Sequence, residues 1–343
     1  MNSELVQSLP VKYRPKTFKE MIGQSSIIKI LQRQIATKNL AHAYLFAGPS
    51  GTGKTTCARA LANYINSFKG SPTEIDAASH SGVDDVRAII ASANERSIDS
   101  EYKIFIIDEC HSLSSQAWQA FLKGIEEPPA YTIFMFCTTN PEKIPDTIQN
   151  RVMKFNLTKI STDGIRDRLR YICQQEGFLN YEEACDYISK IANGGMRDAI
   201  ATLEKCANFD TDLSINNVLT CLGDFSYESM FNLTVSLFNE DIGNVLATIN
   251  QYYNSGYDLK LFVEQYLDFI IDLTKYCVYK DMALVKIPST LMERCDAFSN
   301  IPGSVDYAAN LVEKLLQVKL TIKYDINYKT TIEAMFLAIA RGN

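Results

Sequence analysis

The residues with the clearest chemical signature form the segment GPSGTGKT, which begins at Gly48 and has the spacing GxxxxGK[ST]. Its glycines let successive backbone N–H groups curl around a phosphate, and a following helix adds positive potential from its N-terminus. Lys54 would reach the β- and γ-phosphates of a nucleotide, and the Thr55 hydroxyl would bind Mg²⁺. We therefore predict a phosphate-binding site formed by Gly48, Pro49, Ser50, Gly51, Thr52, Gly53, Lys54, Thr55 and Thr56.

An acidic pair, Asp108 and Glu109, follows about fifty residues later, directly after four apolar residues. A magnesium–nucleotide site needs a carboxylate delivered from a strand beside the phosphate loop. Asp108 would hold the metal, directly or through water, and Glu109 would act as a general base on the attacking water. Four apolar residues before Asp-Glu are a weak signal alone. After a complete phosphate loop they predict ATP and Mg²⁺ as cofactors of a hydrolase.

The elements that must position these motifs alternate between short apolar runs and helical stretches. We expect strands at 43–47, 73–77, 103–108, 131–138 and 153–157, and helices at 54–66, 83–96 and 115–126. The phosphate loop lies between the first strand and the first of these helices. Such alternation predicts an α/β fold, a parallel sheet with helices on both faces.

From residue 162 onward the pattern is helical, with no convincing strand. We expect helices at 165–176, 182–192 and 196–208, and a later set at 230–238, 242–253, 259–279, 305–322 and 331–340. The pattern changes near 160 and near 223. This predicts three domains: an α/β domain over 1–160, a small helical domain over 161–223 and a larger helical domain over 224–343.

The composition is that of a globular protein, with 46% hydrophobic and 22% charged residues in a chain of 343. Its apolar runs fall far short of the roughly 20 residues that a membrane span needs, and the first residues lack the apolar core of a secretory signal. We expect no membrane association and no secretion. The net charge of −6 provides no global field for nucleic acid. Nine cysteines without a CxxC pair read as core residues, so we expect no zinc.

Several further segments narrow the class of protein. They are VKYRP at 11–15, IGQ at 22–24, DECH at 108–111, FLKGIEEPP at 121–129, TTN at 138–140, NRV at 150–152 and GMRDA at 195–199. In order and spacing this set resembles the AAA+ clamp-loader ATPase subunits, closest to the bacterial DNA polymerase III gamma/tau type and related to replication factor C small subunits. The resemblance covers about residues 1–222. Beyond them it rests on length and helical character alone.

The resemblance assigns roles near the nucleotide to residues that the phosphate loop does not include. Tyr13, Arg14, Pro15 and Ile22 match the segment that packs on the adenine. Thr139 matches the sensor-1 position, where a polar side chain at a strand end reads the γ-phosphate. A basic surface strand and a strand-capping threonine are the alternative readings of these two segments.

Two arginines match family positions that act on phosphates. Arg197 matches the sensor-2 arginine, which begins a helix of the small helical domain, the lid, and bends back onto the phosphates of its own subunit. Arg151 matches the arginine that enters a neighbouring subunit's ATP site, where a cation supplied in trans makes hydrolysis depend on assembly. The family's usual Ser-Arg-Cys reads Asn-Arg-Val here, so the charge is kept while its flanking residues differ.

One departure from the gamma/tau pattern follows the phosphate-loop helix. Subunits of that type carry a four-cysteine zinc module between this helix and the next strand, whereas here the short segment 66–72 crosses directly and holds no cysteine. This suits a streamlined relative, of which a virus-encoded protein is one example. We expect the chain to act in the cytoplasm or in the replication compartment of a virus-infected cell.

The resemblance implies an ATPase subunit of a sliding-clamp loader, with an α-helical lid and an α-helical collar that assembles a ring of about five subunits. ATP binding would order the ring, open a ring-shaped clamp and hold primer–template DNA, and hydrolysis would release both. Helix starts and small polar residues would contact phosphates, and Ser79, Ser81, Gly82 and Arg87 are the candidates. A solvated helix start fits these four residues equally well.

Three alternatives share parts of this pattern. Another AAA+ machine, such as a hexameric branch-migration motor, would have the same phosphate loop and acidic pair. A loader subunit with a mainly structural role is a second alternative, against which the intact Lys54, Asp108 and Glu109 argue. A small-molecule P-loop kinase is a third, and it would leave Arg151 and Arg197 unexplained.

Overall fold

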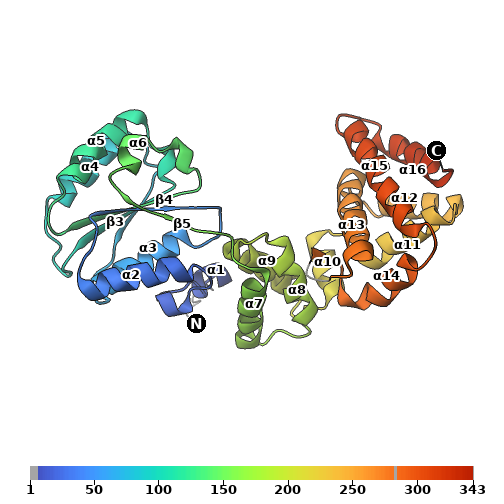
Figure 1. The fold of residues 1–343 in the computed structure, drawn as a ribbon, viewed down its shortest axis with the longest axis horizontal. Coiled ribbons are helices and arrows are strands. Elements are labelled where there is room, and N and C mark those ends of the chain that lie inside the picture. The colour runs from blue at the N-terminus through green and yellow to red at the C-terminus, as the bar shows by residue number, and fades with distance from the viewer. Residues whose placement is uncertain (1–6, 282–283, 343) are drawn as a thin grey trace, which may run out of the picture. The chain divides into compact units, whose positions relative to one another are not determined.

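The computed structural model describes residues 7–281 and 284–342 (Figure 1). The chain divides into two compact units, one of Met1–Glu176 with Ile188–Glu204 and one of Gly177–Tyr187 with Lys205–Asn343. The predicted domain boundaries near 160 and 223 differ from this division and stay predictions. Among the helices of the described residues, none combines the length and the apolar character that crossing a bilayer would need.

The first unit is built on a five-stranded parallel sheet in the order β2-β3-β4-β1-β5, which confirms the predicted fold class. Its strands are β1 Ala43–Ala47, β2 Thr73–Asp76, β3 Lys103–Asp108, β4 Thr132–Thr138 and β5 Met153–Asn156. All residues of β1 and β4 are buried, as expected for central strands covered on both faces. Three predicted strands run one residue too long at one end, at Ala77, Tyr131 and Leu157.

Helices cover both faces of this sheet (Figure 1). On one face α2 Ser25–Thr37 and α3 Lys54–Ile65 bury Leu31 and Leu61 in the cluster that contains Phe46. On the other face α4 Val83–Ala93 and α5 Ser115–Glu126 bury Trp118 with Phe136. The helix predicted at 83–96 is too long, because the chain leaves the helix at Asn94. Helix α2 is not among the predicted helices.

Short elements complete this unit. They are α1 Leu9–Lys12, η1 Phe18–Glu20, η2 Cys110–Ser112, η3 Pro141–Lys143 and α6 Asp146–Gln149. The helices that follow the sheet are α7 Thr162–Glu176, α8 Glu182–Ile191 and α9 Met196–Phe209. The short crossing from α3 to β2 begins at Asn66, whose Nδ2 donates to Tyr102 O at 2.8 Å and whose Oδ1 accepts from Tyr102 N at 2.9 Å, just before β3. The expectation that this crossing holds no zinc stays a prediction.

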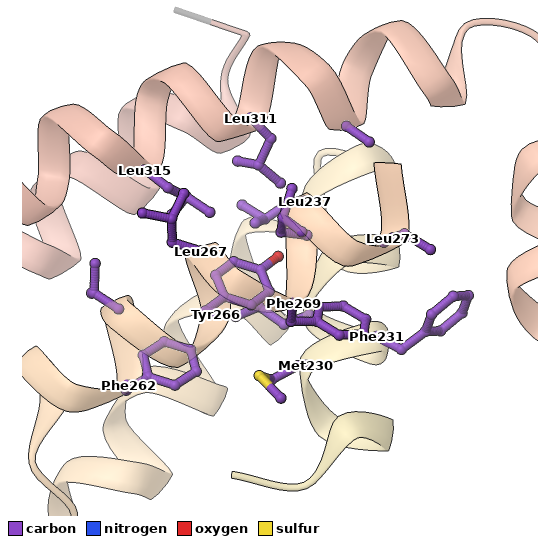
Figure 2. Packing of buried hydrophobic residues seen from close by; sticks show 14 of the residues in the cluster. Met230, Phe231, Leu237, Phe262, Tyr266, Leu267, Phe269, Leu273, Leu311 and Leu315 are labelled. Atoms are coloured by element: carbon purple, nitrogen blue, oxygen red, sulfur yellow. The ribbon is translucent and has the colours of Figure 1, made fainter. Parts of the chain in front are cut away.

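The second unit is helical. Its later helices are α10 Ile215–Leu222, α11 Tyr227–Phe238, α12 Ile242–Asn254, α13 Leu259–Tyr279, α14 Met292–Ser299, α15 Ser304–Ile322 and α16 Tyr328–Ala340, with the turn η5 Ser289–Leu291. Helix α13 carries the centre of the core, where Tyr266 is fully buried with Leu311 and Leu315 of α15 (Figure 2). The Tyr266 hydroxyl is paired with Thr234 Oγ1 at 3.0 Å. Among the described residues no strand follows Asn156, as predicted, and only one isolated bridge joins Leu179 to Asp212.

The nine cysteines behave as core residues. All carry free thiols, and all but Cys221 are buried. Burial raises the pKa of the Cys57 thiol to about 12, so this side chain remains neutral and unreactive at physiological pH. The prediction of buried structural thiols is confirmed for the eight cysteines other than Cys221.

Candidate nucleotide-binding site

The phosphate loop connects the buried strand β1 to helix α3. Gly48 donates its N–H to Thr138 O of β4 at 3.2 Å, which fixes the loop to the strand beside β1. A Cβ on Gly48 would stand 2.5 Å from Leu157 O, a contact that only glycine avoids. Gly53 has φ +95° and ends the loop immediately before the first turn of α3. The loop therefore needs glycine where the sequence pattern has it.

Lys54 brings a buried positive charge into this loop. Lys54 is only 6% exposed. Its Nζ donates to Gly48 O at 3.1 Å and to Pro49 O at 3.0 Å. Within the described residues no ion pair joins this ammonium group to a carboxylate. A buried charge without a counter-ion is costly, so the loop is prepared for an anionic ligand such as a phosphate.

Thr55 and Asp108 provide the oxygen atoms of a candidate metal site. The Thr55 hydroxyl, on the first turn of α3, donates to Asp108 Oδ2 at the end of β3 over 2.8 Å. Hydroxyl and carboxylate oxygens are the hard ligands that Mg²⁺ prefers. Residues 53 positions apart in the chain are thus brought together as the sequence predicts, and the donor set fits magnesium.

Glu109 lies beside Asp108 in a left-handed backbone conformation, with φ 45° and ψ 42°. Its carboxylate Oε2 accepts hydrogen bonds from Thr139 N at 3.3 Å and from Thr139 Oγ1 at 3.1 Å, at the end of the neighbouring strand β4. His111 Nδ1 lies 3.2 Å from the same oxygen. The predicted base and the predicted sensor threonine therefore form one cluster.

These groups line a single cavity of the first unit. The predicted residues that line it are Tyr13, Arg14, Pro15, Ile22, Ser50, Gly51, Thr52, Gly53, Lys54, Thr55, Thr56, Asp108, Glu109 and Arg197. Gly48 and Pro49 contribute to the loop behind the cavity, and Thr139 reaches it through Glu109. The unpredicted lining residues are Pro10, Glu20, Met21, Ile160, Arg168, Met196 and Ile200. That these side chains bind a nucleotide stays a prediction.

The unpredicted Arg168 joins helix α7 to residues 9–15, which we call the N-terminal arm and which run beside the cavity. Its Nη2 donates to Tyr13 O at 2.9 Å, and its guanidinium lies 5.1 Å from the ring of Tyr171. No motif marks this arginine, because it is one of three in the stretch RDRLR of α7. It differs from the two other arginines of this stretch in its position on the helix and in its contact with Tyr13 of the arm.

A second connection between the arm and α7 runs through Glu176. This carboxylate accepts hydrogen bonds from the Tyr13 hydroxyl and, at 2.7 Å, from Lys12 Nζ. Burial and the hydrogen bond to Glu176 raise the pKa of Tyr13 to about 12. The hydrogen bonds from Lys12 and Tyr13 lower the pKa of Glu176 below its ordinary value. The two directions agree on a neutral phenol that donates to an ionised carboxylate.

Helix α9 begins against the phosphate loop. Met196 N donates to Gly51 O at 3.0 Å, and a Cβ on Gly51 would stand 2.8 Å from the Cα of Gly195. The close approach of two glycines is what brings Arg197 to the cavity wall. In the GGMRDA segment, Gly195 thus allows the close approach to the loop, and Arg197 lines the cavity.

Arg151 lies outside this cavity. Its Nε is 2.7 Å from Glu126 Oε1, its Nη1 donates to Thr147 O at 2.7 Å, and its side chain is 42% exposed. It does not line its own subunit's site, which is compatible with a role in a neighbouring one. That role stays a prediction.

The four candidate DNA contacts surround the start of α4. Asp85 accepts from Gly82 N at 3.2 Å, and Arg87 forms an exposed ion pair with Asp84 at 3.0 Å. Ser79 Oγ is 3.4 Å from Asp76 Oδ2, and Ser81 O accepts from Ser114 N at 3.2 Å. Two carboxylates in the first turn oppose the approach of a phosphate. DNA binding here stays a prediction.

A parallel sheet of this order, with a phosphate loop after β1 and an acidic pair at the end of β3, defines the class of AAA+ P-loop ATPases. A solved structure of the RuvB Holliday junction branch migration motor of Thermotoga maritima resembles the chain with a TM-score of 0.53 at 19% identity. The match covers 76% of this chain and 90% of that protein. The structure of its R170A mutant matches the same fractions of the two chains with a TM-score of 0.52. At this identity the likeness concerns the fold alone.

The sequence comparisons identify the family within this class. The family profile described as DNA polymerase III, delta subunit, matches 23–82 and 74–161, and that of DNA polymerase III subunits gamma and tau domain III matches 213–301. DNA polymerase III subunit gamma of Buchnera aphidicola is 34% identical over 73% of this chain and 75% of its own length. The chain belongs to the DNA polymerase III gamma/tau family. The match at 213–301 extends the resemblance beyond residue 222, where the sequence had shown only helical character.

Other relatives are longer than this chain. DNA polymerase III subunit tau of Bacillus subtilis is 35% identical over 79% of the chain but 52% of its own length, and the Escherichia coli tau subunit is 29% identical over 82% and 48%. The chain therefore spans about half the length of the tau relatives that it matches.

Proposed function

We propose that this chain is an ATPase subunit of a DNA sliding-clamp loader. The observation that carries the proposal is the gathering, around one cavity, of the phosphate-loop lysine Lys54, the Thr55–Asp108 pair, Glu109 and Arg197. Membership in the gamma/tau family supports the second half of the proposal, that ATP hydrolysis serves to open a ring-shaped clamp and load it during replication.

The side chains divide the work of hydrolysis. Lys54 and the loop amides would neutralise the phosphates, and Arg197 would add a second cation from the lid. Thr55 and Asp108 would hold Mg²⁺, which supplies charge neutralisation at the phosphates when it is bound. Glu109 would take the proton of the attacking water, with Thr139 holding one of its oxygens. Tyr13, Arg14, Pro15 and Ile22 would enclose the adenine.

Assembly would complete the site. In this proposal the helical collar over 224–343 joins about five subunits into a ring, and Arg151 of one subunit reaches the nucleotide of its neighbour. The partners are other loader subunits, a sliding clamp and primer–template DNA, and the compartment is the cytoplasm or the replication compartment of a virus-infected cell. The acidic net charge of −6 favours DNA contact shared among subunits over binding by one chain.

The branch-migration alternative has less support. RuvB shares the fold at 19% identity, whereas the gamma and tau domain III profile matches the collar region of this chain. A mainly structural subunit is opposed by the complete set of Lys54, Asp108 and Glu109 at one cavity. A small-molecule kinase would not explain the C-terminal helical region.

The proposal is tested by steady-state ATP hydrolysis of the chain, alone and with a sliding clamp and primed DNA. We expect low turnover of the isolated chain and a rise when clamp and primed DNA are present together. Stimulation by branched DNA without a clamp would favour the branch-migration motor instead. Turnover that neither ligand changes would contradict a clamp-loading role.

A further inference from the structure

The carboxylate of Glu109 is held through one of its two oxygens. Oε2 accepts hydrogen bonds from Thr139 N and Thr139 Oγ1 at 3.3 and 3.1 Å, and His111 Nδ1 lies 3.2 Å from the same oxygen. Within the described residues no hydrogen bond of the carboxylate uses Oε1. A general base needs one oxygen free for the proton of water and a fixed orientation of its carboxylate. The contacts to Oε2 can fix this orientation while Oε1 stays free.

His111 makes its contact because of an unusual local backbone. Side chains two positions apart in a helix do not face each other. Here Glu109 has a left-handed conformation, and the turn η2 that follows is closed by Ser112 N donating to Glu109 O at 2.9 Å. This turn directs the imidazole back toward the carboxylate. A left-handed conformation is unfavourable for glutamate, so the surrounding contacts must hold it in place.

Two oxygen atoms beside Nδ1 of His111 favour one tautomer of its ring. Nδ1 faces both Glu109 Oε2 and Thr138 Oγ1, each at 3.2 Å, and Thr138 Oγ1 already accepts from Asn140 N at 3.0 Å. Carboxylate and hydroxyl oxygens both accept hydrogen bonds, so the tautomer with the hydrogen on Nδ1 fits both neighbours. Because Thr138 is buried on β4 and the His111 side chain is only 17% exposed, the ring is braced against the sheet.

We infer that His111 is a positioning residue for the general base. It donates from Nδ1 to Glu109 Oε2, together with Thr139 fixes the carboxylate plane, and leaves Oε1 to take the proton of the attacking water. His111 is not among the residues that line the cavity, so it would act through Glu109. The inference rests on the proposed function, since it assigns Glu109 its role in hydrolysis.

The test compares two substitutions of His111 in the full chain, with clamp and primed DNA present. His111→Ala removes the donor, and we expect kcat to fall about tenfold while KM for ATP stays within about twofold, a smaller loss than that of the base itself. His111→Asn places an amide N–H near the position of Nδ1, so it should recover at least half of the lost rate. If the alanine variant does not fold, His111→Phe replaces it, because phenylalanine fills the volume of the ring without a donor.

A double-mutant cycle separates positioning from a structural role. In a Glu109→Gln chain the base is already lost, so adding His111→Ala should change the residual rate by less than about twofold. An equal loss in both backgrounds, an unchanged or higher kcat for His111→Ala, or failure of His111→Asn to recover activity would each overturn the inference. A wild-type chain without ATPase activity would instead overturn the proposed function, and this inference with it.

Discussion

Lys54 and Glu109 line the same cavity but make different contacts. Lys54 is buried in the phosphate loop and donates to carbonyl oxygens, whereas Glu109 accepts hydrogen bonds at the ends of β3 and β4. One side chain is therefore placed to bind phosphate, and the other to receive a proton. Substitutions at the two positions should separate nucleotide binding from hydrolysis.

We expect Lys54→Ala to abolish ATP binding, because it removes the cation of the phosphate cradle. Glu109→Gln should bind ATP with near wild-type affinity yet hydrolyse it at least ~100-fold more slowly, as expected for a lost base. Calorimetric titration with ATP and single-turnover hydrolysis measure the two quantities. Equal loss of binding in both variants would refute the separate roles.

At the residue scale, the sequence predicts the side chains whose chemistry requires a motif. The GxxxxGK[ST] spacing and the Asp-Glu pair locate Lys54, Thr55, Asp108 and Glu109, and the structure places all four around one cavity. Arg168 is different, because its contact with Tyr13 depends on how the N-terminal arm meets α7. Such tertiary contacts between distant segments leave no local signal in the chain.

Gly51 in the phosphate loop and Gly195 before α9 show how elements are coupled. Gly51 in the phosphate loop has φ +72°, and its Cα lies so close to Gly195 that a side chain would contact backbone. The hydrogen bond from Met196 N to Gly51 O crosses the same junction. The loop that would bind phosphate and the helix that carries Arg197 are thus in direct contact.

Gly51→Ala should weaken nucleotide binding by about tenfold or more, because the methyl group pushes α9 away from the loop. Gly223→Ala is the matched control, since Gly223 has φ +75° with no atom within 4 Å of an added Cβ. Both variants should lose about 1–2 kcal/mol of stability from the left-handed conformation, and only Gly51→Ala should lose affinity. Equal affinities of the two variants in ATP titrations would show that the close approach is unimportant.

The link between the N-terminal arm and α7 should depend on pH through Glu176. Its folded-state pKa lies below the ordinary value of 4.5, so the stabilisation is present above that value and is lost as the pH falls through the folded-state pKa. Because its partner Lys12 is 49% exposed and solvent screens the ion pair, we expect less than about 1 kcal/mol. Thermal unfolding should show wild type more stable than Glu176→Gln at pH 7, with the gap closing below about pH 4. A gap that is constant with pH would contradict this.

At the element scale, the strands and most of the long helices could be predicted, whereas the 13-residue α2 and the short helices α10 and α14 were not. The five strands and α3, α5 and α13 lie where the pattern indicates them. Helix α10 contains two asparagines and a threonine in eight residues, and α14 is equally short, so neither has enough turns for a clear apolar period. Their helical state depends on burial of Val218 and Phe298 in the folded unit.

At the scale of the whole molecule, the proposed function makes hydrolysis depend on assembly through Arg151. If it acts in trans, Arg151→Ala chains should bind ATP but not hydrolyse it, and Lys54→Ala chains should fail to bind it. Mixing the two should place some intact Lys54 sites against intact Arg151 neighbours and restore part of the activity. A missing arginine finger typically costs 10³ to 10⁵ in rate, so a small restored fraction would be measurable.

This complementation depends on subunit exchange, which native mass spectrometry of the mixture can verify. Mixed rings without recovered hydrolysis would contradict the trans assignment. Arg151 would then be a structural residue whose contacts with Glu126 and Thr147 explain its presence.

The central claim is that nucleotide bound at this cavity drives a clamp onto DNA, and transfer of a labelled sliding clamp to primed circular DNA measures it directly. With its partner subunits and ATP, the wild-type chain should leave clamps on the DNA that remain through gel filtration and are lost when the circle is cut. Substituting Lys54→Ala in the same assembly should reduce the yield to that without ATP. Loading by the Lys54→Ala chain at the wild-type level, in rings shown to contain it, would contradict the account.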